Sequence, residues 1–170
     1  MRKNFIRIND SLSDADKQVI EKQISSLPNK PLISIVMPVY NPLEAYLRQA
    51  LDSVREQLYP HWELCIADDA STQPAVRQIL EQYCQIDSRI RVIYRDSNGH
   101  ISHASNSALE LATGEFIALM DQDDLLPVQA LYHVAVEISR FPELDLLYSD
   151  EDKVDEAGIR HDPYFKPDWN

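Results

Sequence analysis

Glycine is scarce in this sequence, which has only Gly99, Gly114 and Gly158 among its 170 residues. The G-x-G-x-x-G fingerprint of dinucleotide-binding proteins and the G-x-x-x-x-G-K phosphate loop both need closely spaced glycines. These three lie far apart along the chain. The sequence therefore excludes a Rossmann-type dehydrogenase and a P-loop nucleoside triphosphatase.

Long apolar runs and paired cysteines are also missing. No stretch approaches the roughly 20 apolar residues that span a bilayer, and residues 1–30 lack the apolar core of a signal peptide. Cys65 and Cys84 fall in apolar patterns and form no C-x-x-C pair, which is typical of buried thiols in a reducing compartment. We expect a cytoplasmic domain without a transmembrane segment. Any attachment to the inner face of the membrane is left to other parts of the full protein.

Positive charge is in deficit. Sixteen Lys and Arg face 28 Asp and Glu, and the net charge of −12 repels a nucleic-acid backbone, so we expect no nucleic-acid partner. Acids are dense between Glu143 and Glu156. Such a density is typical of a solvated edge or hairpin, although carboxylates can also gather cations.

Short apolar runs alternate with stretches of helical periodicity from residue 32 onward. This alternation predicts an α/β domain over residues 31–170, a Rossmann-like three-layer arrangement with a central, mostly parallel sheet. The expected strands are Ile33–Met37, Trp62–Ala67, Ile90–Tyr94, Phe116–Met120 and Leu144–Tyr148.

Capping and turn residues indicate where further helices and turns begin or end. Residues 1–30 form an N-terminal extension with one appended amphipathic helix, which Ser13 and Asp16 begin as a capping box. Gly114 is expected to cap the end of one later helix, and Pro127 to begin the next. The stretch 152–164 contains turn-forming residues and predicts a β-hairpin at the sheet edge.

Polar residues follow the first four expected strands, and ligands of parallel sheets bind beyond the carboxyl ends of the strands. Three of the four ends carry acids. Carboxylates clustered at one edge repel each other unless a cation compensates them. The four segments are Pro38–Pro42, Asp68–Thr72, Asp96–His100 and Asp121–Asp124.

The last of these segments is the candidate metal site. Strand alternation puts Asp121 and Asp123 on the same side, with Gln122 between them and Asp124 next in sequence. Hard oxygen ligands suit Mg²⁺ or Mn²⁺. Alternatively, these acids cap the helix expected near Pro127, but capping explains one or two acids rather than three. We therefore predict a Mn²⁺ or Mg²⁺ site at Asp121, Asp123 and Asp124.

Three motifs together resemble family 2 glycosyltransferases of the GT-A fold: Ser34–Asn41, Ile66–Ser71 and Met120–Asp124. They occur in the family's order and approximate spacing, and the resemblance covers residues 31–170. Two later stretches, Tyr148–Lys153 and Asp162–Trp169, are similar to the subgroup that builds bacterial O-antigen, capsule and related cell-surface polysaccharides.

The resemblance implies roles for individual residues. Asp69 accepts a hydrogen bond from the base, Asp121 faces the ribose or metal, and Asp123 is a direct metal ligand. Relatives commonly carry Arg immediately before Asn106, whereas this chain has Ser105, which puts an Arg-mediated phosphate contact in doubt. The full expected set for the nucleotide sugar is Pro38, Tyr40, Asn41, Asp69, Asn98, Gly99, Asn106 and Asp121.

The expected reaction is metal-dependent sugar transfer, with inversion, from a nucleotide-diphosphate donor to a growing cell-surface glycan or lipid-linked glycan. The metal would neutralise the diphosphate leaving group. The catalytic base is expected beyond Asn170, in an acceptor-binding part that the chain lacks. Within the chain the nearest candidates are Asp150 and Glu151.

Two rival interpretations use the same acids. One is a Mg²⁺-dependent phosphohydrolase with an aspartyl nucleophile, whose D-x-D would follow the first strand rather than the fourth. The other is a noncatalytic nucleotide- or cation-binding regulatory module.

Overall fold

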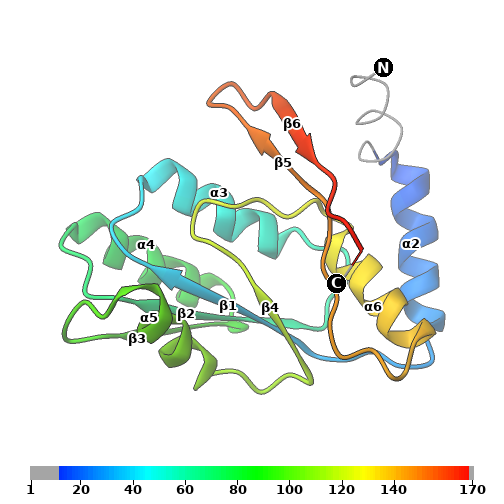
Figure 1. Ribbon diagram of the computed structural model, residues 1–170, viewed down its shortest axis with the longest axis horizontal. Helices are drawn as coiled ribbons and strands as arrows, with labels where there is room; N and C mark the ends of the chain where they lie inside the picture. The colour runs from blue at the N-terminus through cyan, green and yellow to red at the C-terminus, as the bar shows by residue number, and fades with distance from the viewer. Residues whose placement is uncertain (1–11, 169–170) are drawn as a thin grey trace. The chain divides into compact units, whose positions relative to one another are not determined.

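The computed structural model describes residues 12–168 (Figure 1). The chain forms two compact units, Met1–Arg140 and Phe141–Asn170. No helix within the described residues is both long enough and apolar enough to cross a bilayer.

The first unit is built on a four-stranded parallel sheet with the order β3-β2-β1-β4. Every residue of β2 is buried, as expected of a central strand covered on both faces. The first four expected strands are confirmed within two residues at each end. They are β1 (Ile33–Val39), β2 (Trp62–Asp68), β3 (Ile90–Tyr94) and β4 (Phe116–Leu119).

Helices cover both faces of this sheet, which confirms the three-layer prediction (Figure 1). On one face, Ile35 and Met37 share a core cluster with buried residues of α3 (Glu44–Arg55) and α4 (Pro74–Ile86). On the other face, Val36 packs in a smaller cluster with α5 (His100–Leu109). Side chains of alternate residues of β1 thus pack against the helices on opposite faces of the sheet, as the pleat of a strand requires.

Two further helices complete the first unit. The helix α2 (Asp14–Ser26) begins with the expected capping box, because Ser13 and Asp16 satisfy each other's backbone N–H groups. Its buried isoleucines belong to the same core cluster as Leu131 of α6 (Ala130–Arg140). The first 11 residues of the extension lie outside the described part of the chain.

Gly114 is not a helix cap, so that prediction is wrong. The helix α5 ends at Leu109 with Glu110 as its C-cap, and Gly114 instead lies against β1. A Cβ there would meet the Leu32 carbonyl oxygen and would lie 2.9 Å from the backbone nitrogen of Ser34. Glycine is required by this close approach of two backbones.

The last helix begins later than expected. Residues 127–130 form a turn closed by a hydrogen bond of 2.8 Å from Ala130 N to Pro127 O, and α6 starts at Ala130. Pro127 therefore precedes the helix and does not begin it.

The expected strand at Leu144–Tyr148 is also wrong, because these residues form no strand in the second unit. Leu146, Leu147 and Tyr148 are exposed, and no other strand hydrogen-bonds to them. Further along, β5 (Glu151–Val154) and β6 (Arg160–Tyr164) pair antiparallel, which confirms the hairpin. They form a separate two-stranded sheet, closed by a turn in which Gly158 has φ 74°.

A buried carboxylate fastens the chain before β4 to the middle of the sheet. Glu63 of β2 accepts hydrogen bonds from Ser34 of β1 at 2.6 Å and from the backbone and hydroxyl of Thr113. Arg91 of β3 pairs with its other oxygen at 2.6 Å. Burial raises the pKa of Glu63, but these hydrogen bonds and Arg91 outweigh burial and leave the pKa below its usual 4.5.

We predict that Glu63→Gln lowers the free energy of unfolding at neutral pH by about 1–3 kcal/mol, because an amide cannot accept all of these hydrogen bonds. A depressed pKa in the folded state stabilises the protein above the unfolded pKa, and that contribution disappears as pH falls through the folded value. The deficit of the variant should therefore shrink below about pH 4.5.

Urea titrations of both proteins from pH 3 to pH 8 measure this difference. The control is Glu137→Gln, which alters an exposed ion pair of 3.8 Å on α6 and should change stability by less than about 0.5 kcal/mol. A deficit that stays constant over the whole pH range would contradict the role assigned to the Glu63 charge.

Candidate functional site

A pocket of about 450 Å³ opens at the carboxyl end of the parallel sheet. Its wall combines residues that follow all four strands with the first turns of α5. Its volume lies within the range of small-molecule sites. The lining residues are Pro38, Val39, Tyr40, Asp69, Asn98, His100, Ile101, Ala104, Asp121, Gln122 and Asp123.

The structure brings together most of the residues that the sequence nominated. Residues from four separate segments, up to 85 positions apart in sequence between Pro38 and Asp123, share this one wall. They do so because parallel strands end at the same edge of the sheet. The nominated residues in the lining are Pro38, Tyr40, Asp69, Asn98, Asp121 and Asp123.

Asn41, Gly99, Asn106 and Asp124 are not among the lining residues. Asn106 is exposed on α5, and the backbone N–H of Asp124 donates to Asp121 O at 3.2 Å. Asn41 has φ 46°, and its side-chain oxygen accepts from the backbone N–H groups of Thr72 and Gln73 at 2.9 and 3.2 Å. Asn41 thus ties the loop after β1 to the start of α4.

Asp69 is the most buried acid of the pocket, with 2% of its surface exposed. Both carboxylate oxygens accept from the backbone N–H of Gly99 at 3.0 Å, and Oδ1 also accepts from Arg95 Nε at 2.7 Å. A Cβ on Gly99 would lie 2.7 Å from Arg95 Nη2 and 2.8 Å from His103 Cβ. Gly99 is therefore needed for the close packing behind Asp69.

Arg95 is the residue that sequence reasoning missed. It follows β3 directly, and its guanidinium also donates to Ser107 Oγ and His103 O on α5. The sequence could have indicated this role, because Arg95 is a positively charged residue at a strand end, close to strand ends that carry acids. A buried carboxylate needs such a partner, because an unpaired charge is costly inside a protein.

Gln122 belongs to the acidic cluster in sequence but holds a neighbouring loop in the structure. Its side-chain oxygen accepts from Tyr40 N at 2.8 Å, and its side-chain nitrogen donates to Tyr40 O at 3.3 Å. This pair of hydrogen bonds imitates one step of a sheet ladder. It fixes the backbone of Tyr40, whose side chain is 45% exposed at the pocket.

Asp121 and Asp123 present exposed carboxylates at the pocket. They do not cap α6, which begins only at Ala130. Within residues 12–168, no three His, Cys, Asp or Glu side chains gather as a complete metal site. Two carboxylates are nevertheless the usual protein share of a Mg²⁺ or Mn²⁺ site that is completed by waters and phosphate oxygens, so these residues fit such an ion.

Three loops that contribute to the pocket lining each contain a residue in an unfavourable backbone conformation. Asn41, Ala70 and His100 have φ of 46°, 61° and 62°, in loops that follow β1, β2 and β3. Non-glycine residues rarely adopt such angles, and they concentrate at functional sites. The sharp turns aim the neighbouring side chains Tyr40 and Asp69 at the pocket.

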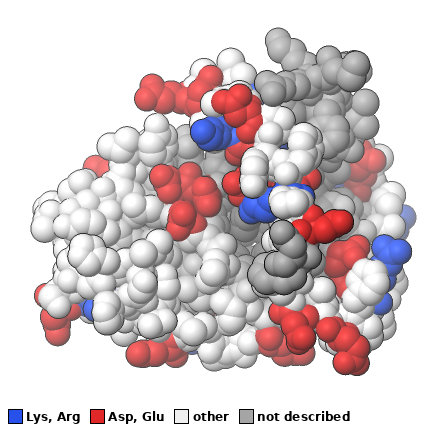
Figure 2. All heavy atoms as spheres, in the orientation of Figure 1, with Lys and Arg blue, Asp and Glu red and all other residues white. Residues whose placement is uncertain are grey.

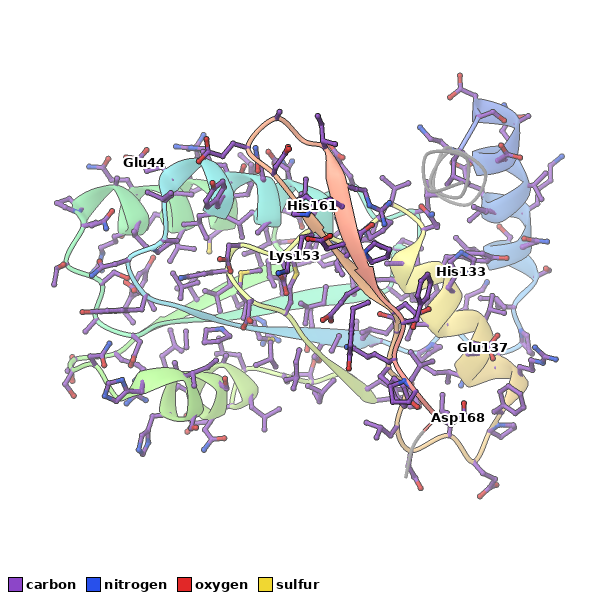
Figure 3. The ribbon with its side chains drawn as sticks, turned by 45° about the horizontal axis from the view of Figure 1, so that its top comes forward. Glu44, His133, Glu137, Lys153, His161 and Asp168 are labelled. Atoms are coloured by element: carbon purple, nitrogen blue, oxygen red, sulfur yellow. The ribbon has the colours of Figure 1, made fainter. Side chains whose placement is uncertain are left out.

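The candidate catalytic bases lie in the second unit. Asp150 Oδ1 accepts from the backbone N–H of Lys166 at 2.9 Å, and Glu151 pairs with Lys166 Nζ at 3.0 Å. They do not follow a fifth strand of the main sheet, so strand order does not place them at its carboxyl edge, as the sequence had suggested. Figure 3 labels Lys153 and His161, which face each other in register on the two strands of this hairpin.

The charge of the surface agrees with the composition. Asp and Glu outnumber Lys and Arg on the face drawn in Figure 2. A negative surface of this kind repels anionic ligands.

The chain belongs to glycosyl transferase family 2, whose model matches residues 34–160. It is 51% identical over 151 residues to the protein y4gI of Sinorhizobium fredii, covering 89% of this chain and 17% of that protein. It is 41% identical to the O-antigen biosynthesis protein RfbC of Myxococcus xanthus, covering 88% of this chain and 12% of that protein. The chain thus spans less than a fifth of the length of either relative.

Solved structures identify the fold as GT-A. TarS of S. aureus, in complex with UDP-GlcNAc, superposes with a TM-score of 0.59 at 32% identity, over 64% of this chain and 31% of that chain. The mannosyltransferase PcManGT of Pyrobaculum calidifontis, in complex with GDP-Man and Mn²⁺, has the same TM-score at 21% identity, over 72% of this chain and 39% of that chain. Membership of this family sets aside the phosphohydrolase interpretation.

We predict that Gln122→Met speeds amide exchange in the segment 38–42, because the Tyr40 N–H loses its acceptor. Global stability should fall by no more than about 1.5 kcal/mol, the usual net worth of a hydrogen bond. Hydrogen–deuterium exchange followed by mass spectrometry measures both segment and whole-chain protection. Tyr40 protection equal to that of the wild type would show that Gln122 does not hold this loop.

Proposed function

We propose that this domain binds a nucleoside-diphosphate sugar with Mn²⁺ or Mg²⁺ and serves an inverting transfer of the sugar to a cell-surface glycan or lipid-linked glycan. The observation that carries the proposal is the pocket in which Tyr40, Asp69, Asp121 and Asp123 meet from three strand ends. Membership of glycosyl transferase family 2 and the likeness to TarS, whose structure holds UDP-GlcNAc, support this ligand.

In this proposal different residues of the pocket bind different parts of the donor. The exposed ring of Tyr40 and the buried carboxylate of Asp69 take the nucleoside, with the base against Asp69. Pro38 and Asn98 line the same region. A desolvated carboxylate forms a strong charge-assisted hydrogen bond to a ring N–H of a base.

The exposed carboxylates hold the cation and, through it, the diphosphate. Asp123 is the direct ligand, and Asp121 faces the ribose or the metal. A bound divalent cation supplies charge neutralisation for the leaving diphosphate. No Lys or Arg appears in the pocket lining, so the described lining offers the diphosphate no other positive side chain.

The relatives support the proposed acceptor, and the thiols support the proposed compartment. Similarity to the O-antigen biosynthesis protein RfbC favours a polysaccharide acceptor at the cell surface. Cys65 and Cys84 are free, which fits synthesis on the cytoplasmic side of the membrane. Apart from the acids assigned to the nucleobase and the metal, the lining contains two side chains that could exchange a proton, His100 and Tyr40.

We predict that Mn²⁺ and UDP or GDP together raise the melting temperature more than the sum of the two added separately. A ligand that binds only the folded state stabilises it by about 2.7 kcal/mol at one hundred times its Kd. Asp123→Ala should remove the increment that depends on Mn²⁺ and leave the fold intact, because the residue is exposed. Differential scanning calorimetry of each combination measures the effect.

Glu137→Gln is the matched control, since it removes an acid on α6 that is not part of the pocket (Figure 3). It should retain the full increment. Nucleotide binding that EDTA leaves unchanged would rule out the metal assignment, and no binding of any nucleoside diphosphate would rule out the proposed function.

A further inference from the structure

Arg95 contacts Asp69 but is not itself part of the pocket lining. Its Nε lies 2.7 Å from Asp69 Oδ1, and 22% of its side-chain surface is exposed. Any effect of Arg95 on a ligand in the pocket must therefore pass through Asp69 or through the helix that also holds it. This geometry is that of a positioning residue.

The guanidinium is itself held on its far side. Its Nη1 donates to Ser107 Oγ and, at 3.2 Å, to the backbone oxygen of His103, both on α5. The Gly99 N–H donates to both carboxylate oxygens of Asp69. The carboxylate therefore cannot rotate without breaking its contacts to Gly99 and Arg95, both in the loop between β3 and α5.

This arrangement leaves Asp69 as a fixed acceptor. An ionised carboxylate has about four lone-pair sites and no donor. Oδ1 of Asp69 accepts from Arg95 Nε and from the Gly99 N–H. Oδ2 accepts only from the Gly99 N–H, which the two oxygens share. Oδ2 therefore retains accepting capacity at the pocket wall.

We propose that Arg95 fixes the Asp69 carboxylate as a pure acceptor and so makes the pocket select bases with a ring N–H, uracil or guanine, over cytosine and adenine. The inference rests on the proposed donor pocket. Cytosine and adenine present a lone pair where uracil and guanine present the N–H, so they would oppose one acceptor with another. Sites built to pair with a polar hydrogen discriminate strongly against ligands that lack it.

Loss of Arg95 removes this selectivity through the charge of Asp69. A buried carboxylate without its cation is costly, and it turns toward water. A carboxylate that has turned away no longer distinguishes the bases. Lysine keeps the charge but lacks the planar fork that joins Asp69 to α5.

The test measures the Kd of UDP, CDP, GDP and ADP in saturating Mn²⁺ by calorimetry. UDP is compared with CDP and GDP with ADP, so that each comparison is between two pyrimidines or between two purines. The wild type should bind UDP over CDP, or GDP over ADP, by at least about fivefold, the equivalent of one unsatisfied buried acceptor. Arg95→Met should bring that ratio to within about twofold of unity, mainly by weakening the preferred nucleotide. Arg95→Lys, which retains the charge, should give an intermediate ratio.

The matched control is Arg91→Met, which breaks the 2.6 Å pair between Arg91 of β3 and Glu63 of β2, neither of which lines the pocket. It should lower the melting temperature and leave the base ratio unchanged. The inference would be overturned if Arg95→Met weakened the binding of all four nucleotides equally. If the Met variant does not fold, a base ratio in Arg95→Lys equal to that of the wild type would overturn it. Failure of the wild type to bind any of the four would instead overturn the proposed function.

Discussion

Burial of the central strands β1 and β2 on both faces governs the rest of the structure. Backbone groups inside the sheet satisfy each other, and the side chains of β2 are wholly enclosed, so polar chemistry can emerge only where the strands end. Tyr40, Asp69 and Asp121 lie just beyond three strand ends and meet in one pocket for this reason. The Glu63 network lies at the opposite, amino ends of the strands, where it joins β1, β2, β3 and the residues before β4.

Each polar group at this edge is either exposed to the pocket or held by another polar group. Asp69 is held by Gly99 and Arg95, whereas Asp123 is exposed. The two acids therefore differ in what they can bind. A fixed and desolvated carboxylate suits a directional hydrogen bond, and an exposed one suits a hydrated divalent ion.

The sequence predicted the features that depend on local pattern. Apolar runs located four strands, and the box at Ser13 and Asp16 located the start of α2, because burial and capping leave direct marks on residue type. Gly114 and the run at Leu144–Tyr148 were misread. Their structure depends on distant neighbours: Gly114 approaches the backbone before β1, and the run finds no strand to pair with.

The site was only partly predictable for the same reason. Strand-end position and the family resemblance nominated six residues that line the pocket, but neither could reveal that Gln122 holds Tyr40 or that Arg95 holds Asp69. Those contacts cross 82 and 26 positions of sequence. Asn41 was nominated for the ligand, yet its amide joins two loops, a role that appears only in three dimensions.

The central claim is that nucleoside diphosphate and metal meet at Asp121 and Asp123 rather than at the denser acids between Glu143 and Glu156. Paramagnetic broadening of backbone NMR signals by a low proportion of Mn²⁺, with UDP or GDP present, tests this directly. Broadening should centre on residues 121–123, with nearby signals from Tyr40 and Asn98 also affected, and Asp123→Ala should abolish it. Broadening centred on residues 143–156, and unchanged by that substitution, would instead place the metal at the second acidic stretch.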